Sequence, residues 1–468
     1  PSEEQPSWIR TLYRGAVPCP MVPIVAAPVI TGYRNKNEFC IGGSPAVVGF
    51  KSGDWASEVV AVEKDCPVVT TNMIAVCQAV QRFARQSQYT SFDPKSKTGF
   101  FRMLCMREGT TPGDTAVVLI VNGAEVDAAE LSAELEKFVA FMEAERSTGD
   151  LAYSSLISCD CRQNDFDPRR DSLVTHRGTG VVKIALDVPV TTSAGFNSES
   201  SSSEAKQSTK LEFKVSPFAF FQVNTLAAVK LFALIREFTG AWDVGGKPAG
   251  VVFDVCCGTG TLGLMVAAEL KRCRGQQKSH TEVVGVELVA AAVEDANVNA
   301  RVNQVSNFRA ICGKAEEVLP RLLQQLNGSK FAFGSPPIAS EPATLTVASS
   351  EDPSSSATTE LKDQPPQVAE DTNPAVVILD PPRAGCVKSV LRSIRKNASI
   401  KRVVYVACNP DSLMRDVTEL CKHNMANTSD IGFVPVKAAS VDMFPHTPHV
   451  ETLMLLERSD LPAAAKFA

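Results

Sequence analysis

Glycines, carboxylates and a cysteine stand directly after short β-branched runs of the sequence. Residues 251–255 (VVFDV) lead into the glycine-rich turn 256–263 (CCGTGTLG), and residues 283–287 (VVGVE) end on Glu287. Glycine lets a backbone approach a ligand closely, and a carboxylate at the end of the next strand can accept hydrogen bonds from both hydroxyls of a ribose. The pairing indicates a site for a ligand that contains a nucleoside.

The turn alone leaves two kinds of ligand open. Gly258, Gly260 and Gly263 have the G-x-G-x-x-G spacing of dinucleotide enzymes, in which a pyrophosphate sits on the helix N-terminus. Asp254 stands just before the turn, however, and a carboxylate there suits a zwitterionic amino-acid tail better than a pyrophosphate. The later motifs must decide between the two.

Two more strand ends carry reactive groups. Residues 376–379 (VVIL) lead to Asp380 and a rigid diproline, and residues 405–407 (YVA) lead to Cys408. Ligands of open α/β sheets bind at the carboxyl ends of the strands, where a thiolate could attack an electrophilic carbon. Taken alone, Cys408 is more readily explained as one more buried cysteine.

The elements that position these residues indicate an α/β fold. Beyond about residue 240, β-branched strands alternate with helical patterns, which predicts a doubly wound, mostly parallel sheet. The expected strands are 250–256, 282–287, 375–379 and 402–406. Residues 8–213 mix short apolar runs with helices, as an α+β domain does, and Asp127 with Glu130 forms a capping-box pattern at the start of one helix.

Two stretches lack the periodicity of a helix or a strand. A serine-rich segment at 195–210 lies between strands expected at 181–190 and 211–215. Residues 334–373 are rich in Ser, Pro, Thr and acidic residues. Such compositions cannot bury enough apolar surface to fold, so both are predicted to be disordered insertions.

Length and charge bound the function. The chain has 468 residues, 44% apolar and 21% charged, which is typical of a globular protein of two or three domains. Its 47 basic and 52 acidic residues give a net charge of −5, so any nucleic-acid binding needs a local basic patch. Candidates for that patch are Arg34, Lys36, Arg102 and Arg107. The apolar run 116–121 (AVVLIV) is far too short to span a bilayer, so no membrane partner is expected.

The 14 cysteines show no C-x-x-C spacing, which excludes the common zinc and iron–sulfur patterns, and no metal is expected. Scattered cysteines favour reduced thiols and hence a cytoplasmic or nuclear location.

Several ordered motifs resemble those of the RNA uracil-C5 methyltransferase family, most closely its eukaryotic tRNA (uracil-5-)-methyltransferase branch. They are residues 33–39 (YRNKNEF), 216–225 (SPFAFFQVNT), the strand ends described above, and residues 441–451 (VDMFPHTPHVE). The resemblance extends over nearly the whole chain. It implies a Rossmann-like class I methyltransferase domain at 214–468, preceded by an α+β central domain at 1–213 that contacts RNA.

The resemblance also assigns roles. Gln222 and Asp380 would contact the methyl donor S-adenosylmethionine, and Glu287 would hold its ribose. Cys256, Gly258 and Thr261 would line its methionine portion. Cys408 would be the nucleophile and Glu451 the general base, although Glu451 could otherwise simply begin an exposed strand.

The implied reaction is methylation of uridine at C5 in RNA, with the T-loop uridine of tRNA favoured. The base must leave its stack to react, and Phe220, Phe221 and Phe444 are possible walls for it, although each is more often a core residue.

Two other classes of function compete. Exocyclic-amine methyltransferases of nucleic acids prefer an aromatic residue after the diproline, where this chain has Arg383. A non-catalytic RNA-binding or tRNA-folding module would be indicated by loss of Cys408, Glu451 or Asp380, and all three are present.

Overall fold

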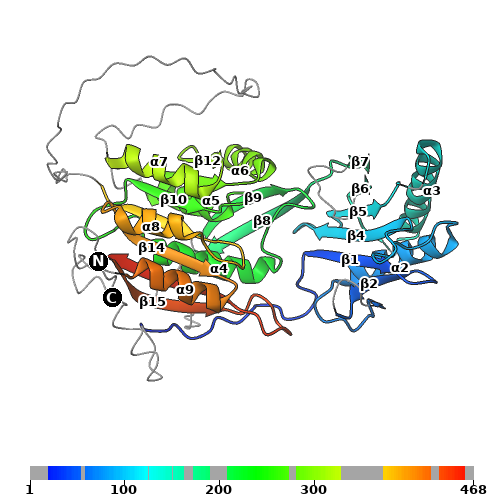
Figure 1. Cartoon of the computed structure of the whole chain (residues 1–468), viewed down its shortest axis with the longest axis horizontal. Coiled ribbons are helices and arrows are strands. Elements are labelled where there is room, and N and C mark those ends of the chain that lie inside the picture. The colour runs from blue at the N-terminus through cyan, green and yellow to red at the C-terminus, as the bar shows by residue number, and fades with distance from the viewer. Residues whose placement is uncertain are drawn as a thin grey trace, which may run out of the picture.

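The computed structural model describes most of the chain, in nine segments: residues 19–53, 58–124, 126–149, 151–162, 172–189, 208–273, 281–327, 373–422 and 432–458. They build two sheets that lie side by side along the longest axis of the molecule, with a hairpin between them (Figure 1).

The first sheet contains seven described strands and is mostly antiparallel. In spatial order they are β3 (Val59–Ala61), β2 (Val47–Lys51), β1 (Lys36–Gly42), β4 (Phe101–Glu108), β5 (Thr115–Val121), β6 (Ser155–Asp160) and β7 (Ser172–Arg177). β5 and β6 pair in parallel and are joined by helix α3 (Ala128–Ser147). With α2 (Thr71–Gln86), α3 covers one face of this sheet, where Phe83, Phe138 and Met142 are buried.

The start of α3 follows from its capping residues. The carboxylate of Asp127 accepts a hydrogen bond from the backbone N–H of Glu130 at 2.8 Å, which satisfies one of the free donors of the first turn. The predicted helix is therefore confirmed, including its N-terminus.

The second sheet also contains seven described strands. Their order is β12 (Phe308–Cys312), β11 (Glu282–Glu287), β10 (Val251–Val255), β13 (Ala375–Leu379), β14 (Ile400–Ala407), β16 (Glu451–Arg458) and β15 (Phe433–Val441). The first five are parallel, whereas β16 runs antiparallel to both of its neighbours. The predicted doubly wound, mostly parallel sheet is confirmed.

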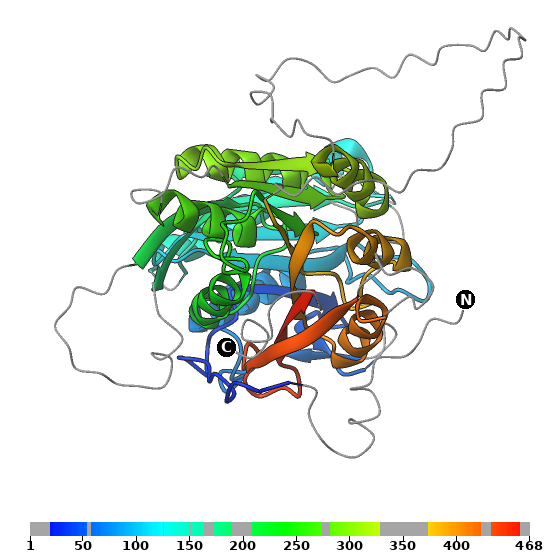
Figure 2. The same cartoon turned by 90° about the vertical axis from the view of Figure 1, so that its left-hand side faces the viewer.

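Helices cover both faces of this sheet (Figure 2). One face packs against α4 (Thr225–Thr239), α5 (Thr261–Cys273) and α6 (Ala290–Val302), and the other against α7 (Ala315–Asn327), α8 (Lys388–Lys396) and α9 (Pro410–Leu420). Successive strand residues alternate between the two cores, as Val252 and Phe253 do, because side chains of a strand point to opposite faces. Burial on both faces explains why these strands are continuously apolar in sequence.

A hairpin of β8 (Val182–Pro189) and β9 (Ser208–Val215) packs against the helices of the second sheet. Its inward side chains, among them Ile184 and Phe213, share a core with α4 and α5. The domain boundary expected at 213/214 thus falls inside β9. The start of the described chain also lies on the second sheet, since the N–H of Val22 donates to the carbonyl of Ala438 at 2.8 Å.

The predicted range of the serine-rich insertion, 195–210, extends too far at its C-terminal end. Residues 208–210 are the first residues of β9 and pair with β8, where strand hydrogen bonds satisfy their backbone. The rest of that expected insertion lies outside the described residues, and so does the one at 334–373 apart from residue 373. Among the described helices, none combines the length and the apolar character that a bilayer crossing requires.

Candidate active site

The carboxyl ends of β10, β11, β13 and β14 open into one cavity of about 810 Å³, a volume suited to a small organic ligand. Seven residues expected from the sequence line it: Gln222, Cys256, Gly258, Glu287, Asp380, Cys408 and Glu451. Thr261 is not among the described residues of its wall. It begins α5, and its hydroxyl lies 3.2 Å from that of Thr259. The structure therefore brings together all but one of the expected site residues.

The turn after β10 is shaped by left-handed backbone at Cys256 (φ 65°) and Gly258 (φ 54°). Glu287 stabilises this turn, because its carboxylate accepts hydrogen bonds from the N–H of Gly258 at 3.0 Å and from the N–H of Val289 at 2.9 Å. Glu287 thus reaches the cavity from the neighbouring strand while it holds the turn in place.

Asp254 plays a different part from the one its sequence position suggests. Its side chain is fully buried and accepts from the N–H of Gly263 at 2.8 Å. A Cβ at Gly263 would lie 2.9 Å from that carboxylate, so the close approach requires glycine. Burial raises the pKa of Asp254 to about 7, with Asp380 and Glu287 adding to the shift. Asp254 therefore stabilises the turn through its hydrogen bond with Gly263 and is not part of the described cavity wall.

Cys408 and Glu451 meet because their strands are neighbours. β14 and β16 pair antiparallel with Ala407 opposite Thr452. Cys408 directly follows Ala407 and Glu451 directly precedes Thr452, so the two residues lie beside each other. Glu451 is 3% exposed, so it does not begin an exposed strand. Burial, and after it the negative charge of Asp380, raises the pKa of Glu451 well above its ordinary value. Burial also raises the pKa of Asp380.

Arg383, in the loop after β13, lines the same cavity as Cys408. Burial raises the pKa of this thiol, Glu451 raises it further, and the charge and hydrogen bond of the Arg383 guanidinium oppose the shift. Arg383 is a site residue to which the sequence analysis gave no role. Its position in the sequence could have indicated a role, because Arg383 directly follows the diproline, where exocyclic-amine methyltransferases prefer an aromatic residue.

Gln222 is positioned by a residue of the first sheet's unit. The side-chain amide of Asn35 donates to the backbone carbonyl of Gln222 at 3.0 Å and to the hydroxyl of Thr225 at 2.8 Å. The hydroxyl of Tyr33 donates to the carbonyl of Pro445 at 2.9 Å. The first, second and last sequence motifs therefore meet at the mouth of the cavity, although they lie far apart in the chain.

The three aromatic residues expected as walls for the target base fall into two groups. Phe220, which is 66% exposed, and Phe444 line the cavity, whereas Phe221 is buried in the core. Phe220 and Phe444 can therefore contact a ligand.

The four residues expected to form a basic patch lie in different environments. Arg34 lines the cavity, and Lys36 pairs with Glu38 at 2.8 Å. Arg102 stacks on Phe92, with the guanidinium carbon 4.3 Å from the ring centre. The prediction that Arg107 belongs to a phosphate-binding patch is wrong. Arg107 is fully buried, and its guanidinium donates to the carbonyls of Pro217 and Ala219.

Comparisons with known proteins agree with this geometry. A profile of the tRNA (Uracil-5-)-methyltransferase family matches residues 367–459, and a general methyltransferase-domain profile matches residues 247–333. The chain is 31% identical to the human tRNA (uracil-5-)-methyltransferase homolog A over 95% of its own length and 59% of that protein. It is also 31% identical to the Arabidopsis thaliana zinc finger CCCH domain-containing protein 24, over 97% of this chain and 63% of that protein. The chain thus spans about three-fifths of the length of these relatives.

Among solved structures, the chain resembles the tRNA (uracil-54, C5)-methyltransferase of Pyrococcus abyssi, determined in complex with S-adenosyl-L-homocysteine. The TM-score is 0.57 at 19% identity, covering 93% of this chain and 78% of that one. The sheet order and this likeness define a class I methyltransferase fold. In sequence, the chain is similar to proteins of the tRNA (uracil-5-)-methyltransferase family, whose profile matches its C-terminal part.

Proposed function

We propose that this protein transfers a methyl group from S-adenosylmethionine to C5 of a uridine in RNA, with the T-loop uridine of tRNA as its target. The observation that carries the proposal is the meeting of Cys408 and Glu451 inside the cavity that contains the Gly258 turn and Glu287. A nucleoside-binding turn serves many methyltransferases, whereas a thiol beside a buried carboxyl suits methylation at a carbon. The similarity to mammalian tRNA (uracil-5-)-methyltransferase homologs supports tRNA as the substrate.

The cavity fits the methyl donor by its chemistry. Glu287 offers carboxylate oxygens for a ribose, and the half-exposed apolar side chains of Leu288 and Val387 offer surfaces for a nucleobase. Asp380 and Glu451 form an acidic end whose pKa values are raised by burial, and a cation favours the ionised forms of such carboxyls. The donor supplies a methyl group on a positively charged sulfur.

The covalent path explains why a cysteine and a carboxylate are both needed. C5 of uracil is a poor nucleophile, so a direct transfer is slow. In the proposed reaction the Cys408 thiolate bonds to C6, and the electron pair of the 5,6 double bond moves toward C5 as an enolate. C5 then takes the methyl group from S-adenosylmethionine, whose S–CH3 bond breaks so that S-adenosylhomocysteine leaves. Glu451 then removes the C5 proton, the double bond reforms, and the thiolate leaves.

The test of this function is nucleoside analysis of RNA. Unmodified tRNA is incubated with the protein and methyl-labelled S-adenosylmethionine, digested to nucleosides, and analysed by mass spectrometry. The proposal expects the label in 5-methyluridine. A label in a methylated adenosine or guanosine would support the exocyclic-amine class instead, and absence of label in a protein that binds tRNA would support a non-catalytic module.

Loss of either strand-end carboxylate should weaken binding of the methyl donor. We expect Glu287→Ala and Asp380→Ala each to lower the affinity for S-adenosylmethionine roughly ten- to a hundredfold, because a hydrogen bond to a charged group contributes about 1.5–3 kcal/mol. Calorimetry measures the affinity. Glu282→Ala, at the opposite end of β11, is the matched control and should bind like wild type. Unchanged affinity in both site variants would contradict the assignment.

Loss of Arg383 should move the pH dependence of the thiol's reaction. The guanidinium lowers the pKa of Cys408 against the effects of burial and Glu451, so its removal raises that pKa. We therefore expect Arg383→Gln to trap 5-fluorouridine RNA with a pH midpoint shifted upward. At a pH below both midpoints the variant should trap RNA more slowly than wild type, because a smaller fraction of its Cys408 is thiolate. A midpoint that stays in place or moves downward would show that Arg383 does not act on the thiol.

A further inference from the structure

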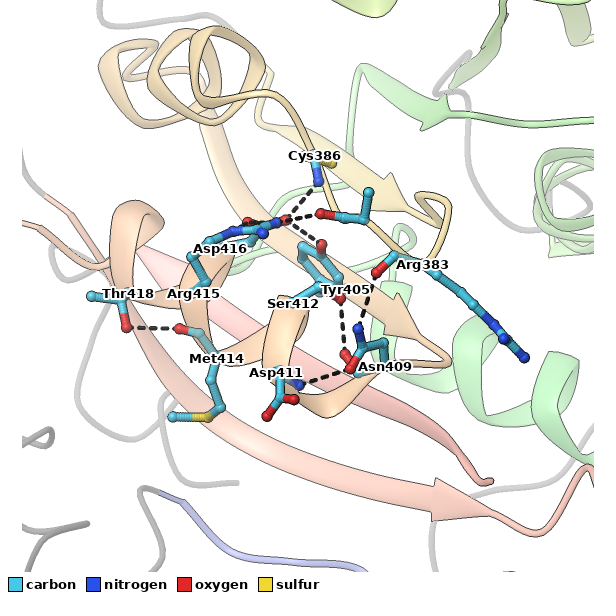
Figure 3. A network of polar contacts seen from close by, with 11 residues as sticks. Arg383, Cys386, Tyr405, Asn409, Asp411, Ser412, Met414, Arg415, Asp416 and Thr418 are labelled. Carbon is cyan, nitrogen blue, oxygen red and sulfur yellow. Dashed lines mark hydrogen bonds and ion pairs between the residues drawn. The ribbon is translucent and has the colours of Figure 1, made fainter. Parts of the chain in front are cut away.

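The loop after β13 carries two groups of the proposed site and is held by the helix that follows Cys408. Residues 380–387, the catalytic loop, contain Asp380 and Arg383 and form much of one cavity wall. Helix α9 begins at Pro410, two residues beyond Cys408. Figure 3 shows polar side chains of α9 pointing toward the backbone of this loop.

Three hydrogen bonds join α9 and its N-cap to the catalytic loop (Figure 3). The side-chain amide of Asn409 donates to the carbonyl of Arg383 at 3.1 Å, and the guanidinium of Arg415 donates to the carbonyl of Ala384 at 2.6 Å. The N–H of Cys386 donates to the carboxylate of Asp416 at 2.6 Å. The backbone on both sides of Gly385 is therefore tied to one helix.

Asp416 is the centre of this arrangement. Its carboxylate is 1% exposed and accepts from the hydroxyl of Tyr405 at 2.6 Å, from the N–H of Cys386, and from Arg415 at 2.9 Å. Burial raises the pKa of Tyr405, which keeps its hydroxyl protonated as a donor. Asp416 thus joins β14, α9 and the catalytic loop through one buried group.

The close approach of the loop to Asp416 depends on Gly385. That residue has a φ of 80°, and a Cβ there would lie 2.5 Å from an Asp416 carboxylate oxygen. Only glycine adopts this conformation readily and leaves room for the carboxylate. The Ala384-Gly385-Cys386 turn is therefore shaped to receive Asp416.

We propose that Asp416 is a positioning residue, which fixes the catalytic loop so that the Arg383 guanidinium is held against the Cys408 sulfur. Asp416 is not part of the described cavity wall, so it acts through the loop and not on a ligand. The proposal rests on the function proposed above for its meaning in catalysis, but the contact between Arg383 and Cys408 can be tested without RNA.

The expected consequence is a change in thiol reactivity. The charged groups that bear on Cys408 are Arg383 and Asp380 from the catalytic loop and Glu451 from β16, and His449 lines the same cavity. If the loop moves, the favourable interaction with Arg383 weakens while Glu451 stays on its own strand. The thiol should then ionise at higher pH.

The experiment measures alkylation of Cys408 by iodoacetamide in the full chain as a function of pH. Mass spectrometry follows the tryptic peptide 403–415, which contains Cys408 as its only cysteine. We expect Asp416→Asn to shift the alkylation midpoint upward, in the direction expected for Arg383→Gln, and to slow alkylation roughly tenfold below both midpoints. Tyr405→Phe, which removes one donor and keeps the carboxylate, should shift it less in the same direction and serves if Asp416→Asn does not fold.

Glu419→Gln is the matched control. Glu419 is a second buried carboxylate on α9, 6% exposed, but it pairs with Arg392 of α8 and with Lys422 and not with the catalytic loop. We expect it to change thermal stability and to leave the alkylation midpoint in place. The proposal is overturned if Asp416→Asn, or Tyr405→Phe in its place, keeps the wild-type midpoint, or if Glu419→Gln shifts the midpoint equally. Absence of methylation by the wild-type chain would instead refute the proposed function, and the alkylation profiles would still decide the role of Asp416.

Discussion

Replacement of Cys408 by alanine is expected to abolish 5-methyluridine formation and covalent capture of RNA together. Without the sulfur there is no attack on C6, and turnover should fall by roughly a thousandfold or more, as is usual when a nucleophile is removed. The measurements are nucleoside mass spectrometry and a denaturing gel with 5-fluorouridine RNA, whose fluorine cannot be removed as a proton.

Cys312→Ala is the control for that variant. Cys312 is an exposed thiol at the end of β12, on the same edge of the sheet. We expect this control to methylate and to trap fluorinated RNA like wild type. Production of 5-methyluridine by Cys408→Ala at the wild-type rate would contradict the covalent path.

Glu451→Gln is expected to fail at a later stage than Cys408→Ala. The amide cannot take the C5 proton, but attack and methyl transfer do not require it. The variant should therefore stay joined to methylated RNA that contains ordinary uridine, as a slower band on a denaturing gel. Wild type should form such a band only with fluorinated RNA.

Glu457→Gln controls for loss of a buried carboxylate on the same strand. Glu457 pairs with Arg402 at 2.6 Å at the far end of β16. This variant should be less stable than wild type but should not accumulate the band with ordinary RNA. A Glu451→Gln variant that binds the methyl donor and RNA but forms no band would show that another group is the base.

The strand-end residues of the site could be predicted from the sequence for a topological reason. Parallel strands carry their carboxyl ends to one edge, so Gly258, Glu287, Asp380 and Cys408 were expected to meet once the alternation of strands and helices was recognised. Glu451 reached the same edge by a different route, through the antiparallel pairing of β16 with β14. Its place depended on the resemblance to a family, because no local pattern indicates that pairing.

The residues whose roles could not be predicted act through contacts between distant segments. Arg107 looked like a surface cation, but it is buried against the carbonyls before Gln222. Asp254 looked like a ligand contact, but it bonds to a backbone N–H nine residues later. Asp416 gave no signal, because its partners come from a loop and a strand whose packing the local sequence does not encode. In each case the deciding interaction is tertiary.

The attachment site of trapped RNA tests the central claim most directly. Among the described residues, three thiols line the cavity, those of Cys256, Cys386 and Cys408, so the experiment must identify which cysteine reacts. Wild-type protein is trapped on 5-fluorouridine tRNA with S-adenosylmethionine, digested with trypsin and ribonuclease, and mapped by tandem mass spectrometry. We expect a methylated fluorouridine on Cys408, in peptide 403–415. The same adduct on Cys386, in peptide 384–388, or on Cys256 would contradict the account.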